Sequence, residues 1–466
     1  MLRFLRRQTV RWLLLFGVIE LLLLASSLQL AMRLRYLRDA DDLVDVSHNL
    51  LLRSFIFGSV IMLGIAAFGG YRQHLRTTWQ GAVARQAVAF LIGGLLLVVG
   101  YYVVPQAYVG RGVLGIALAI GFLAVMVFRL AFMRVVEIES LKPRVLILGT
   151  GQRAAQIHNR MRRRSDRRGF TVVGYVPCAN EEIAIPADKL LTADVPLPVL
   201  AKRERIDEIV VGVDDRRGRL PMDGLLACRQ AGVTITDLTT FFERESGRVQ
   251  LLWLEPSWLV FSRGFHATPV HRLAKRCFDV AAALLLLLLC WPLMAMVALA
   301  IRLESGPGQP ILYRQERVGE NGKTFWLLKF RSMRTDAERD GIARWASKQD
   351  DRVTRVGRVC RKLRFDELPQ LWNVLKSEMS IVGPRPERPQ FVADLATKIP
   401  YYSLRHCLKP GLAGWAQLSY PYGASEEDAA EKLKYDLFYV KNHNLLFDML
   451  ILIETAEVVL FNRGAR

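Results

Sequence analysis

The sequence has few cysteines, and their arrangement excludes the structures that cysteine usually supports. The six cysteines of this 466-residue chain form no C-x-x-C pair, so neither a disulfide framework nor a zinc site is indicated. Acidic residues are also under-represented, because 44 Asp and Glu residues face 64 Lys and Arg residues, for a formal net charge of +20. This excess indicates anionic partners, which include lipid headgroups, phosphorylated substrates and nucleic acid.

Long apolar runs, in contrast, are plentiful. Hydrophobic residues make up 52% of the chain, and four apolar runs cover roughly residues 12–30, 50–70, 86–104 and 112–132. Each run is near the length that a helix needs to cross a bilayer, so we predict four transmembrane helices within residues 1–140. Basic residues gather before the first run and after the fourth, which places both ends of this region in the cytoplasm. Glu20 lies inside the first run, and we expect it to pack against a neighbouring helix.

From residue 141 the long apolar runs give way to short predicted strands. A buried strand at 145–148 runs into Gly149-Thr150-Gly151-Gln152-Arg153-Ala154, and further strands are predicted at 170–176, 208–213 and 233–237. We therefore predict a small parallel sheet of Rossmann type over 141–240, followed by a linker at 241–270. The glycine turn could seat a pyrophosphate. Because no acid ends the second strand, where residues 177–180 read Pro-Cys-Ala-Asn, a structural or regulatory module is favoured over one that binds NAD.

A fifth apolar stretch, residues 280–301, is uncharged and long enough to span a membrane. Two features argue against a simple span. Basic residues flank it on both sides, and Trp291-Pro292 lies at its midpoint, where proline removes a helix hydrogen bond. We therefore predict a re-entrant helix over 275–303 that enters from the cytoplasmic side, breaks at Pro292 and returns.

An acid pair, Asp366-Glu367, stands just before Pro369, which favours the first turn of a helix. Such acids often do no more than mark a helix start. Here they are preceded by a stripe of basic residues, which favours phosphates as counter-ions over solvent alone. The stripe consists of Arg352, Arg355, Arg358, Arg361, Lys362 and Arg364.

Two further segments carry cations. Lys329 and Arg331 alternate with Phe330, as in a strand that turns both cations to one face, although a solvated edge strand gives the same pattern. Pro384-Arg385-Pro386 is a rigid loop that can present one guanidinium to a planar anion.

From about His271 to the C-terminus, the ordered set of motifs resembles the bacterial sugar transferase family, the polyprenyl-phosphate phosphoglycosyl transferases. The motifs are Lys275-Arg276-Cys277-Phe278-Asp279, Gln315-Glu316-Arg317-Val318-Gly319, Lys329-Phe330-Arg331-Ser332-Met333, the acid pair, Pro384-Arg385-Pro386 and Lys409-Pro410-Gly411-Leu412-Ala413-Gly414-Trp415-Ala416-Gln417. One departure is Trp415, where small or aliphatic residues commonly follow the glycine; this difference could affect the fit of sugar or lipid. Large members of the family also carry a four-span region and a Rossmann-like module before the transferase.

The resemblance implies a ping-pong reaction in which Asp366 attacks the β-phosphorus of a UDP-sugar, releases UMP and carries a phosphosugar until undecaprenyl phosphate accepts it. Glu367 assists, and both acids would hold Mg2+. The residues that would bind substrate are Gln315, Arg317, Lys329, Arg331, Arg385 and Pro386. The implied activity is transfer of a hexose 1-phosphate, from UDP-glucose or UDP-galactose, in the first membrane step of exopolysaccharide, capsule or O-antigen synthesis.

The expected architecture is a membrane α-helical region plus an α/β module, followed by a mostly helical catalytic domain at 271–466 with its re-entrant helix. The expected location is the bacterial inner membrane, with both termini and the catalytic domain in the cytoplasm. Expected partners are the two substrates and anionic membrane lipids, with no nucleic acid, while homodimerisation stays open.

Two other functions would each account for part of the sequence. A membrane-bound NAD-dependent nucleotide-sugar dehydratase needs a Tyr-x-x-x-Lys pair, which occurs nowhere in the chain. A non-enzymatic scaffold or nucleic-acid binder would account for the positive charge but leaves the acid pair, the Pro-Arg-Pro loop and the apolar stretch at 280–301 unexplained.

Overall fold

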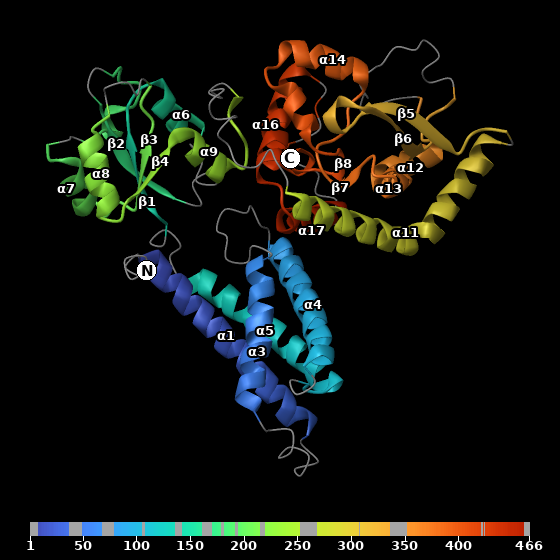
Figure 1. The fold of residues 1–466 in the computed structure, drawn as a ribbon, viewed down its shortest axis with the longest axis horizontal. Coiled ribbons are helices and arrows are strands. Elements are labelled where there is room, and N and C mark those ends of the chain that lie inside the picture. The colour runs from blue at the N-terminus through green and yellow to red at the C-terminus, as the bar shows by residue number, and fades with distance from the viewer. Residues whose placement is uncertain are drawn as a thin grey trace. The chain divides into compact units, whose positions relative to one another are not determined.

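The computed structural model describes residues 8–36, 49–67, 79–104, 108–135, 142–160, 170–178, 181–191, 194–214, 220–251, 268–306, 308–335, 352–420, 423 and 425–460 (Figure 1). The chain divides into two compact units, Met1–Ser246 and Gly247–Arg466.

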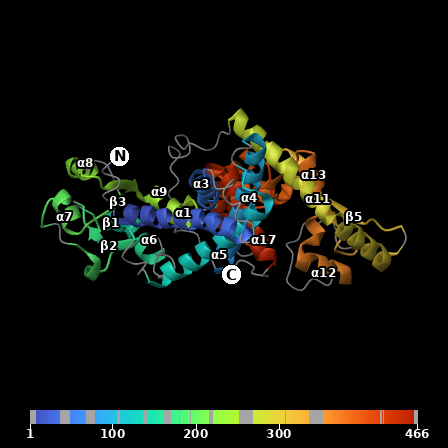
Figure 2. The same ribbon diagram turned by 90° about the horizontal axis from the view of Figure 1, so that it is seen from below.

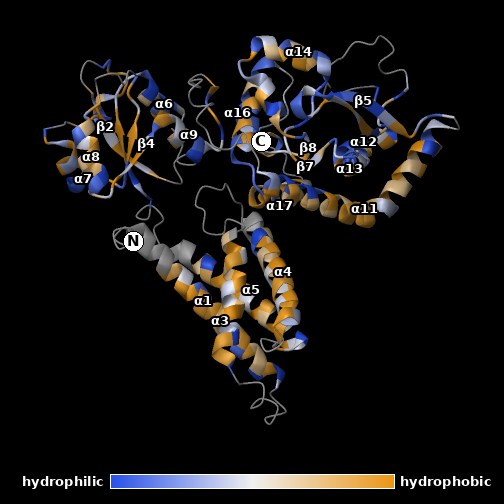
Figure 3. Cartoon of the chain, viewed as in Figure 1, coloured by the Kyte–Doolittle hydropathy of each residue, from blue (hydrophilic) through white to orange (hydrophobic). Residues whose placement is uncertain are grey.

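Four helices form the N-terminal region where the apolar runs predict them, and Figure 3 shows that apolar residues cover most of their length. They are α1 (Gln8–Arg35), α3 (Leu50–Ala67), α4 (Trp79–Val103) and α5 (Arg111–Val135). By length and apolar composition, α1, α4 and α5 can each cross a membrane, whereas α3 contains a shorter apolar segment. With 18 residues, α3 is about 27 Å long, slightly less than a typical bilayer core.

Glu20 packs against a neighbouring helix, as expected. Its side chain is fully buried in α1, and the Arg129 guanidinium of α5 donates to both carboxylate oxygens at 2.6 and 3.2 Å. An unpaired charge in this position would be costly, so the ion pair specifies which face of α1 meets α5.

A four-stranded parallel sheet follows, with strand order β2-β1-β3-β4. Its strands are β1 (Arg144–Leu148), β2 (Thr171–Val176), β3 (Glu208–Val211) and β4 (Thr234–Asp237), close to the predicted ranges. In Figure 1, α7 (Leu197–Arg203) and α8 (Met222–Gln230) cover one face, and α6 (Gln152–Arg160) and α9 (Leu238–Ser246) cover the other. The short 3-10 helix η4 (Ala187–Lys189) follows β2.

The first residues of the predicted linker belong to this sheet unit. Helix α9 continues to Ser246, and both Phe241 and Phe242 are buried. Phe241 lies edge-on to Phe170, with ring centroids 4.9 Å apart. The connection therefore begins after residue 246, later than the predicted 241. Residues 252–267 of the predicted linker lie outside the described ranges.

The C-terminal unit combines helices with two small β pairings. An antiparallel hairpin joins β5 (Leu312–Val318) to β6 (Thr324–Phe330) through η6 (Glu320–Gly322), and β7 (Ser380–Val382) pairs in parallel with β8 (Gly411–Ala413). The remaining elements are α11 (Pro269–Ser305), α12 (Arg355–Leu363), η7 (Phe365–Glu367), α13 (Gln370–Leu375), α14 (Pro389–Lys398), η8 (Tyr402–Cys407), α15 (Trp415–Ser419), α16 (Glu426–Asn442) and α17 (Leu445–Leu460).

Helix α11 is continuous through Pro292, so the predicted break in the helix is wrong. A proline inside a helix removes one hydrogen bond and bends the axis, and the flanking residues can stay helical. Figures 1 and 2 show α11 as one long helix, and in Figure 1 its axis changes direction along its length.

Both ends of α11 are tied to the same compact unit. Near the start, Arg276 donates two 2.7 Å hydrogen bonds to the last carbonyls of α13, and Lys275 contacts Asp448 of α17 at 2.7 Å. Near the end, the Glu304 carboxylate accepts hydrogen bonds from the first amides of α12, at 2.7 Å from Arg355. A straight helix of 37 residues would be about 55 Å long, so these attachments hold the bent helix along one side of the unit.

Candidate active site

The acid pair lies in η7, between α12 and α13. Arg364 ends α12 in the left-handed conformation, with φ of 61°, and this turn redirects the chain into η7. Asp366 and Glu367 are only 8% and 9% exposed, and α13 begins three residues after Glu367, with Pro369 as its N-cap. The prediction that both acids directly precede a helix start is confirmed.

Three cations converge on one oxygen of Glu367. Arg385 lies 3.0 Å from Oε1, Arg364 lies at 3.5 Å and Lys329 at 3.8 Å. Burial alone would raise the pKa of Glu367, but Arg385, Lys329 and Arg364 outweigh burial and lower this pKa to about 2. Glu367 is therefore an ionised, firmly held carboxylate.

Asp366 has a different environment. Among the described residues, no side chain makes a hydrogen bond or ion pair with its carboxylate. Burial and the neighbouring charge of Glu367 raise the pKa of Asp366, and Lys329, Arg361 and Arg364 offset only part of this effect. A more basic carboxylate without a partner is a better nucleophile than one that is already ion-paired. The two adjacent acids are thus chemically distinct.

A buried asparagine fixes the strand that carries Lys329. Asn373 of α13 accepts a hydrogen bond from the Leu328 amide at 3.0 Å and donates one to the Trp326 carbonyl at 2.8 Å. These bonds occupy the edge of β6 that β5 leaves open, so α13 is attached to β6. Lys329 is held beside Glu367 as a result. No sequence pattern assigns this role to Asn373, although Asn373 follows the acid pair by only six residues.

The Pro-Arg-Pro loop is held through three consecutive carbonyls. The carbonyl of Arg385 accepts from Arg405 at 3.0 Å, that of Pro386 from Arg317 at 3.1 Å, and that of Glu387 from the Val318 amide at 3.0 Å. Arg317 also donates to Gln315 at 2.6 Å. The predicted substrate residues Gln315 and Arg317 are therefore engaged in supporting the loop.

Arg331 is placed differently from Lys329. It follows the last residue of β6, is buried, and donates to Gln309 at 3.4 Å. Of the six predicted substrate residues, Lys329 and Arg385 directly contact the acid pair, whereas Gln315, Arg317 and Pro386 form the surrounding loop support.

Close backbone packing explains the glycines that flank the loop. A Cβ added at Gly411 would lie 2.0 Å from the Gly383 nitrogen, and one at Gly414 would lie 2.5 Å from the Gly383 oxygen. These distances are too short for any side chain, so β7 and β8 approach each other only because these positions are glycine. The Pro-Arg-Pro loop leaves the sheet at this crossing.

Gln417 and Trp415 follow this crossing and have different roles. Gln417 accepts a hydrogen bond from Arg385 at 3.1 Å, so it orients the same guanidinium that binds Glu367. Trp415 donates to the Gly247 carbonyl at 2.7 Å and packs against Phe447, with centroids 5.3 Å apart. These contacts pack the partly buried Trp415 against the core, and its effect on sugar or lipid fit stays a prediction. Gln417 was missed, although its motif had been singled out.

The donor set is compatible with Mg2+, which commonly takes one or two carboxylates and completes its shell with water and substrate phosphates. The Asp366 carboxylate makes no hydrogen bond or ion pair with the described side chains, and the three cations around Glu367 all contact Oε1. No cluster of three or more His, Cys, Asp or Glu side chains suited to a metal occurs within the described ranges. Asp366, with the second oxygen of Glu367, fits a metal that is bound together with a diphosphate.

The glycine turn of the parallel sheet offers little room for a second anion. The first amides of α6, at Gln152 and Arg153, each donate to Asp214 at 2.8 Å, and the Thr150 amide donates to Glu181 at 2.8 Å. The chain's own carboxylates thus occupy the position that a pyrophosphate would take. This geometry disfavours the alternative of an NAD-dependent dehydratase.

Comparison with known proteins places these residues in a family. Residues 270–462 match the model of the bacterial sugar transferase family. A UDP-N-acetylgalactosamine-undecaprenyl-phosphate N-acetylgalactosaminephosphotransferase from Aeromonas hydrophila is 41% identical over 52% of this chain and 56% of its own length. An undecaprenyl-phosphate glucose phosphotransferase from Komagataeibacter xylinus is 33% identical over 69% of this chain and 60% of its own length.

The chain thus spans a little over half the length of these two relatives. A UDP-glucose:undecaprenyl-phosphate glucose-1-phosphate transferase from Caulobacter vibrioides is 43% identical over 41% of this chain and 72% of its own length. The matched residues contain the acid pair, its cations and the Pro-Arg-Pro loop. The chain belongs to the bacterial sugar transferase family.

Proposed function

We propose that the protein transfers a sugar 1-phosphate from a UDP-sugar to undecaprenyl phosphate and releases UMP, the step that starts exopolysaccharide assembly. The observation that carries this proposal is the asymmetry of the acid pair: no described side chain pairs with the Asp366 carboxylate, whereas three cations hold Glu367. The names of the relatives support the acceptor and the reaction type. We propose UDP-glucose or UDP-galactose as the donor.

The free carboxylate suits a two-step displacement. An Asp366 oxygen forms a bond to the β-phosphorus while the bond from that phosphorus to the bridging oxygen breaks, and UMP leaves with the electron pair. A phosphate oxygen of undecaprenyl phosphate then attacks the same phosphorus and returns Asp366 as a carboxylate. When bound, Mg2+ supplies charge neutralisation on the diphosphate. Lys329 and Arg385 add positive charge from the protein.

The second half of α11 supports a position of this chemistry near a lipid surface. Val297 and Ile301 pack under Phe365 and Leu368, which flank the acid pair. Several other apolar side chains of α11 are exposed, including Leu288 and Trp291 at 69% and 62%. We propose that this exposed side is immersed in one leaflet. The acid pair then lies at the level of the phosphate of a long-chain lipid, with anionic headgroups near the arginines of α12.

The test is an assay of the purified, full-length protein with undecaprenyl phosphate, Mg2+ and a panel of UDP-glucose, UDP-galactose and their N-acetylated forms. We expect release of UMP and formation of a lipid-linked sugar diphosphate with one member of the panel. The panel also decides between hexose and N-acetylhexosamine donors. Failure of every donor to release UMP in the presence of the acceptor would contradict the proposal.

The pH dependence of this activity should report on Lys329. Burial lowers the pKa of Lys329 to about 8, against the attraction of Glu367. Below this pH the ammonium is charged; above it, the charge on Lys329 and its attraction for the diphosphate are lost. We expect kcat/KM to fall about tenfold per pH unit above pH ~8.5, because one proton is lost from the free enzyme.

The matched variant is Lys329→Arg, since a guanidinium stays charged throughout this range. We expect it to lower kcat/KM at neutral pH and to remove the alkaline decline. Lys398→Arg, on the surface of α14, is the control and should leave the profile unchanged. An alkaline decline of the same position in Lys329→Arg would assign the titration to another group.

A further inference from the structure

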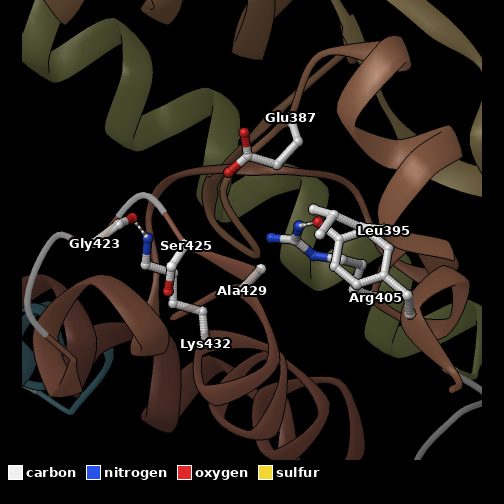
Figure 4. Close-up of a pocket in the computed structure, with 8 residues that line it drawn as sticks. Glu387, Leu395, Arg405, Gly423, Ser425, Ala429 and Lys432 are labelled. Atoms are coloured by element: carbon white, nitrogen blue, oxygen red, sulfur yellow. Dashed lines mark hydrogen bonds between the residues drawn. The ribbon is translucent and has the colours of Figure 1, made fainter. Parts of the chain in front are cut away.

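A second charged pair lies behind the Pro-Arg-Pro loop. Arg405 of η8 is 5% exposed, and its guanidinium lies 2.7 Å from Asp436 of α16, which is 2% exposed. Arg405 also donates to the Tyr402 hydroxyl at 2.7 Å and to the Arg385 carbonyl at 3.0 Å. Figure 4 shows the Arg405 guanidinium in the wall of a pocket, with Glu387 on one side and Lys432 across from it.

A contribution to the stability of the fold is, by itself, a weak explanation for the buried Arg405–Asp436 pair. Two charges removed from water lose more hydration energy than their attraction usually returns, so an apolar pair of similar volume would often be at least as stable. Burial opposes the charged form of Arg405, but Asp436, Tyr402 and Glu387 together outweigh this effect, so the pKa of Arg405 lies above its usual value. The guanidinium is therefore a permanent cation with a fixed orientation.

The orientation matters because of the atom that Arg405 holds. Its bond goes to the main chain of Arg385, whose own side chain contacts Glu367 at 3.0 Å and Gln417 at 3.1 Å. The neighbouring carbonyls, of Pro386 and Glu387, are held from β5. Arg405, on η8, binds the third carbonyl of the loop, that of Arg385. Arg385 is the residue whose side chain enters the active site.

We propose that Arg405, fixed by Asp436, is a positioning residue that sets the direction of Arg385 and thereby maintains the contact of Arg385 with Glu367 and with the donor nucleotide. The inference rests on the proposed transfer reaction for its kinetic part only. Lysine keeps the charge at position 405, but one ammonium cannot reproduce the planar contacts to Asp436, Tyr402 and the Arg385 carbonyl.

The kinetic test is a double-mutant cycle between Arg405→Lys and Arg385→Lys in the full-length protein. If Arg405 acts through Arg385, Arg405→Lys alone should raise KM for the UDP-sugar roughly tenfold to a hundredfold, with a smaller change in kcat. In the Arg385→Lys background it should have almost no further effect. Additive losses would show that Arg405 only stabilises the fold, and would overturn the proposal.

A second measurement does not depend on transfer. Phenylglyoxal modifies accessible guanidinium groups. The folded, full-length protein is labelled and then digested, and mass spectrometry of the peptides gives the rate of modification at Arg385. We expect Arg405→Lys to speed modification of Arg385 severalfold, while Arg248, which pairs with Glu431 on α16, keeps its rate. An unchanged rate at Arg385 would contradict the positioning role. Faster modification together with no UMP release from any donor in the wild-type protein would sustain the positioning role and refute only the proposed reaction.

Discussion

Asp366→Asn is expected to abolish both sugar transfer and covalent labelling of the protein. An amide has nearly the shape of the carboxylate but cannot serve as the attacking oxyanion, so we expect kcat to fall by roughly 10⁴-fold or more. Since no described side chain is paired with the Asp366 carboxylate, the substitution leaves no buried cation without its partner. The folded state should therefore persist. Labelling is measured with a UDP-sugar radioactive in its sugar, after denaturation and removal of free nucleotide.

Two comparisons make this result specific. Asp394→Asn changes an exposed acid of α14 and should leave both labelling and transfer intact. Glu367→Gln removes the partner of three cations, so it should slow transfer and weaken donor binding yet still permit labelling on Asp366. Full turnover by Asp366→Asn would remove the displacement mechanism.

The chemically reactive part of the site could be predicted from the sequence because its signals are local. Asp366, Glu367 and Pro369 lie within four positions, and the Pro-Arg-Pro loop is contiguous. The strands of the parallel sheet were also predicted, since buried β-branched runs followed by glycine are typical of that fold. What these local patterns could not give is the pairing of Arg385 and Lys329 with one acid and not the other.

Two of the missed residues, Asn373 and Arg405, share a physical property: they bond to main-chain atoms far away in the sequence. Asn373 binds the backbone of β6, 47 positions away, and Arg405 binds a carbonyl 20 positions away. Every residue carries a backbone carbonyl with the same chemistry. The sequence therefore does not show which carbonyl a distant side chain will bind. Arg317 shows the converse difficulty. Its motif predicts a substrate contact, and the structure adds what the motif could not give: the nearest acceptors of Arg317 belong to the loop and to Gln315.

The other large expected effect concerns the face of the membrane on which each end of α11 lies. In the structure both ends of the helix bind one compact unit, through Arg276 and Glu304. A helix that crossed the bilayer would separate these attachments by the hydrocarbon thickness, about 30 Å. Both flanks are also basic. We therefore predict that the residues before and after α11 lie on the same, cytoplasmic face.

Single introduced cysteines test this predicted sidedness directly. They are made by Val270→Cys and Lys323→Cys in a background with the native cysteines replaced by serine. Both positions are exposed. A membrane-impermeant maleimide should label both in inside-out vesicles and neither in intact spheroplasts, and the cysteine-free parent should stay unlabelled in both. Labelling of Lys323→Cys from outside, with Pro292 unchanged, would rule out a re-entrant helix and would place Asp366 away from cytoplasmic UDP-sugars.

Pro292→Leu should favour a membrane-spanning α11 over the re-entrant one. Leucine restores the missing N–H and removes the clash that bends the axis, so the apolar stretch gains stability as a straight span. The contacts of Arg276 and Glu304 oppose that change, because a straight helix must break at least one of them. When Pro292→Leu is combined with Lys323→Cys, we expect part of the population to expose the introduced thiol to the outside and transfer to fall in proportion. Cys290→Leu, an apolar change two positions earlier in the same helix, is the matched control and should keep both the wild-type sidedness and the wild-type rate.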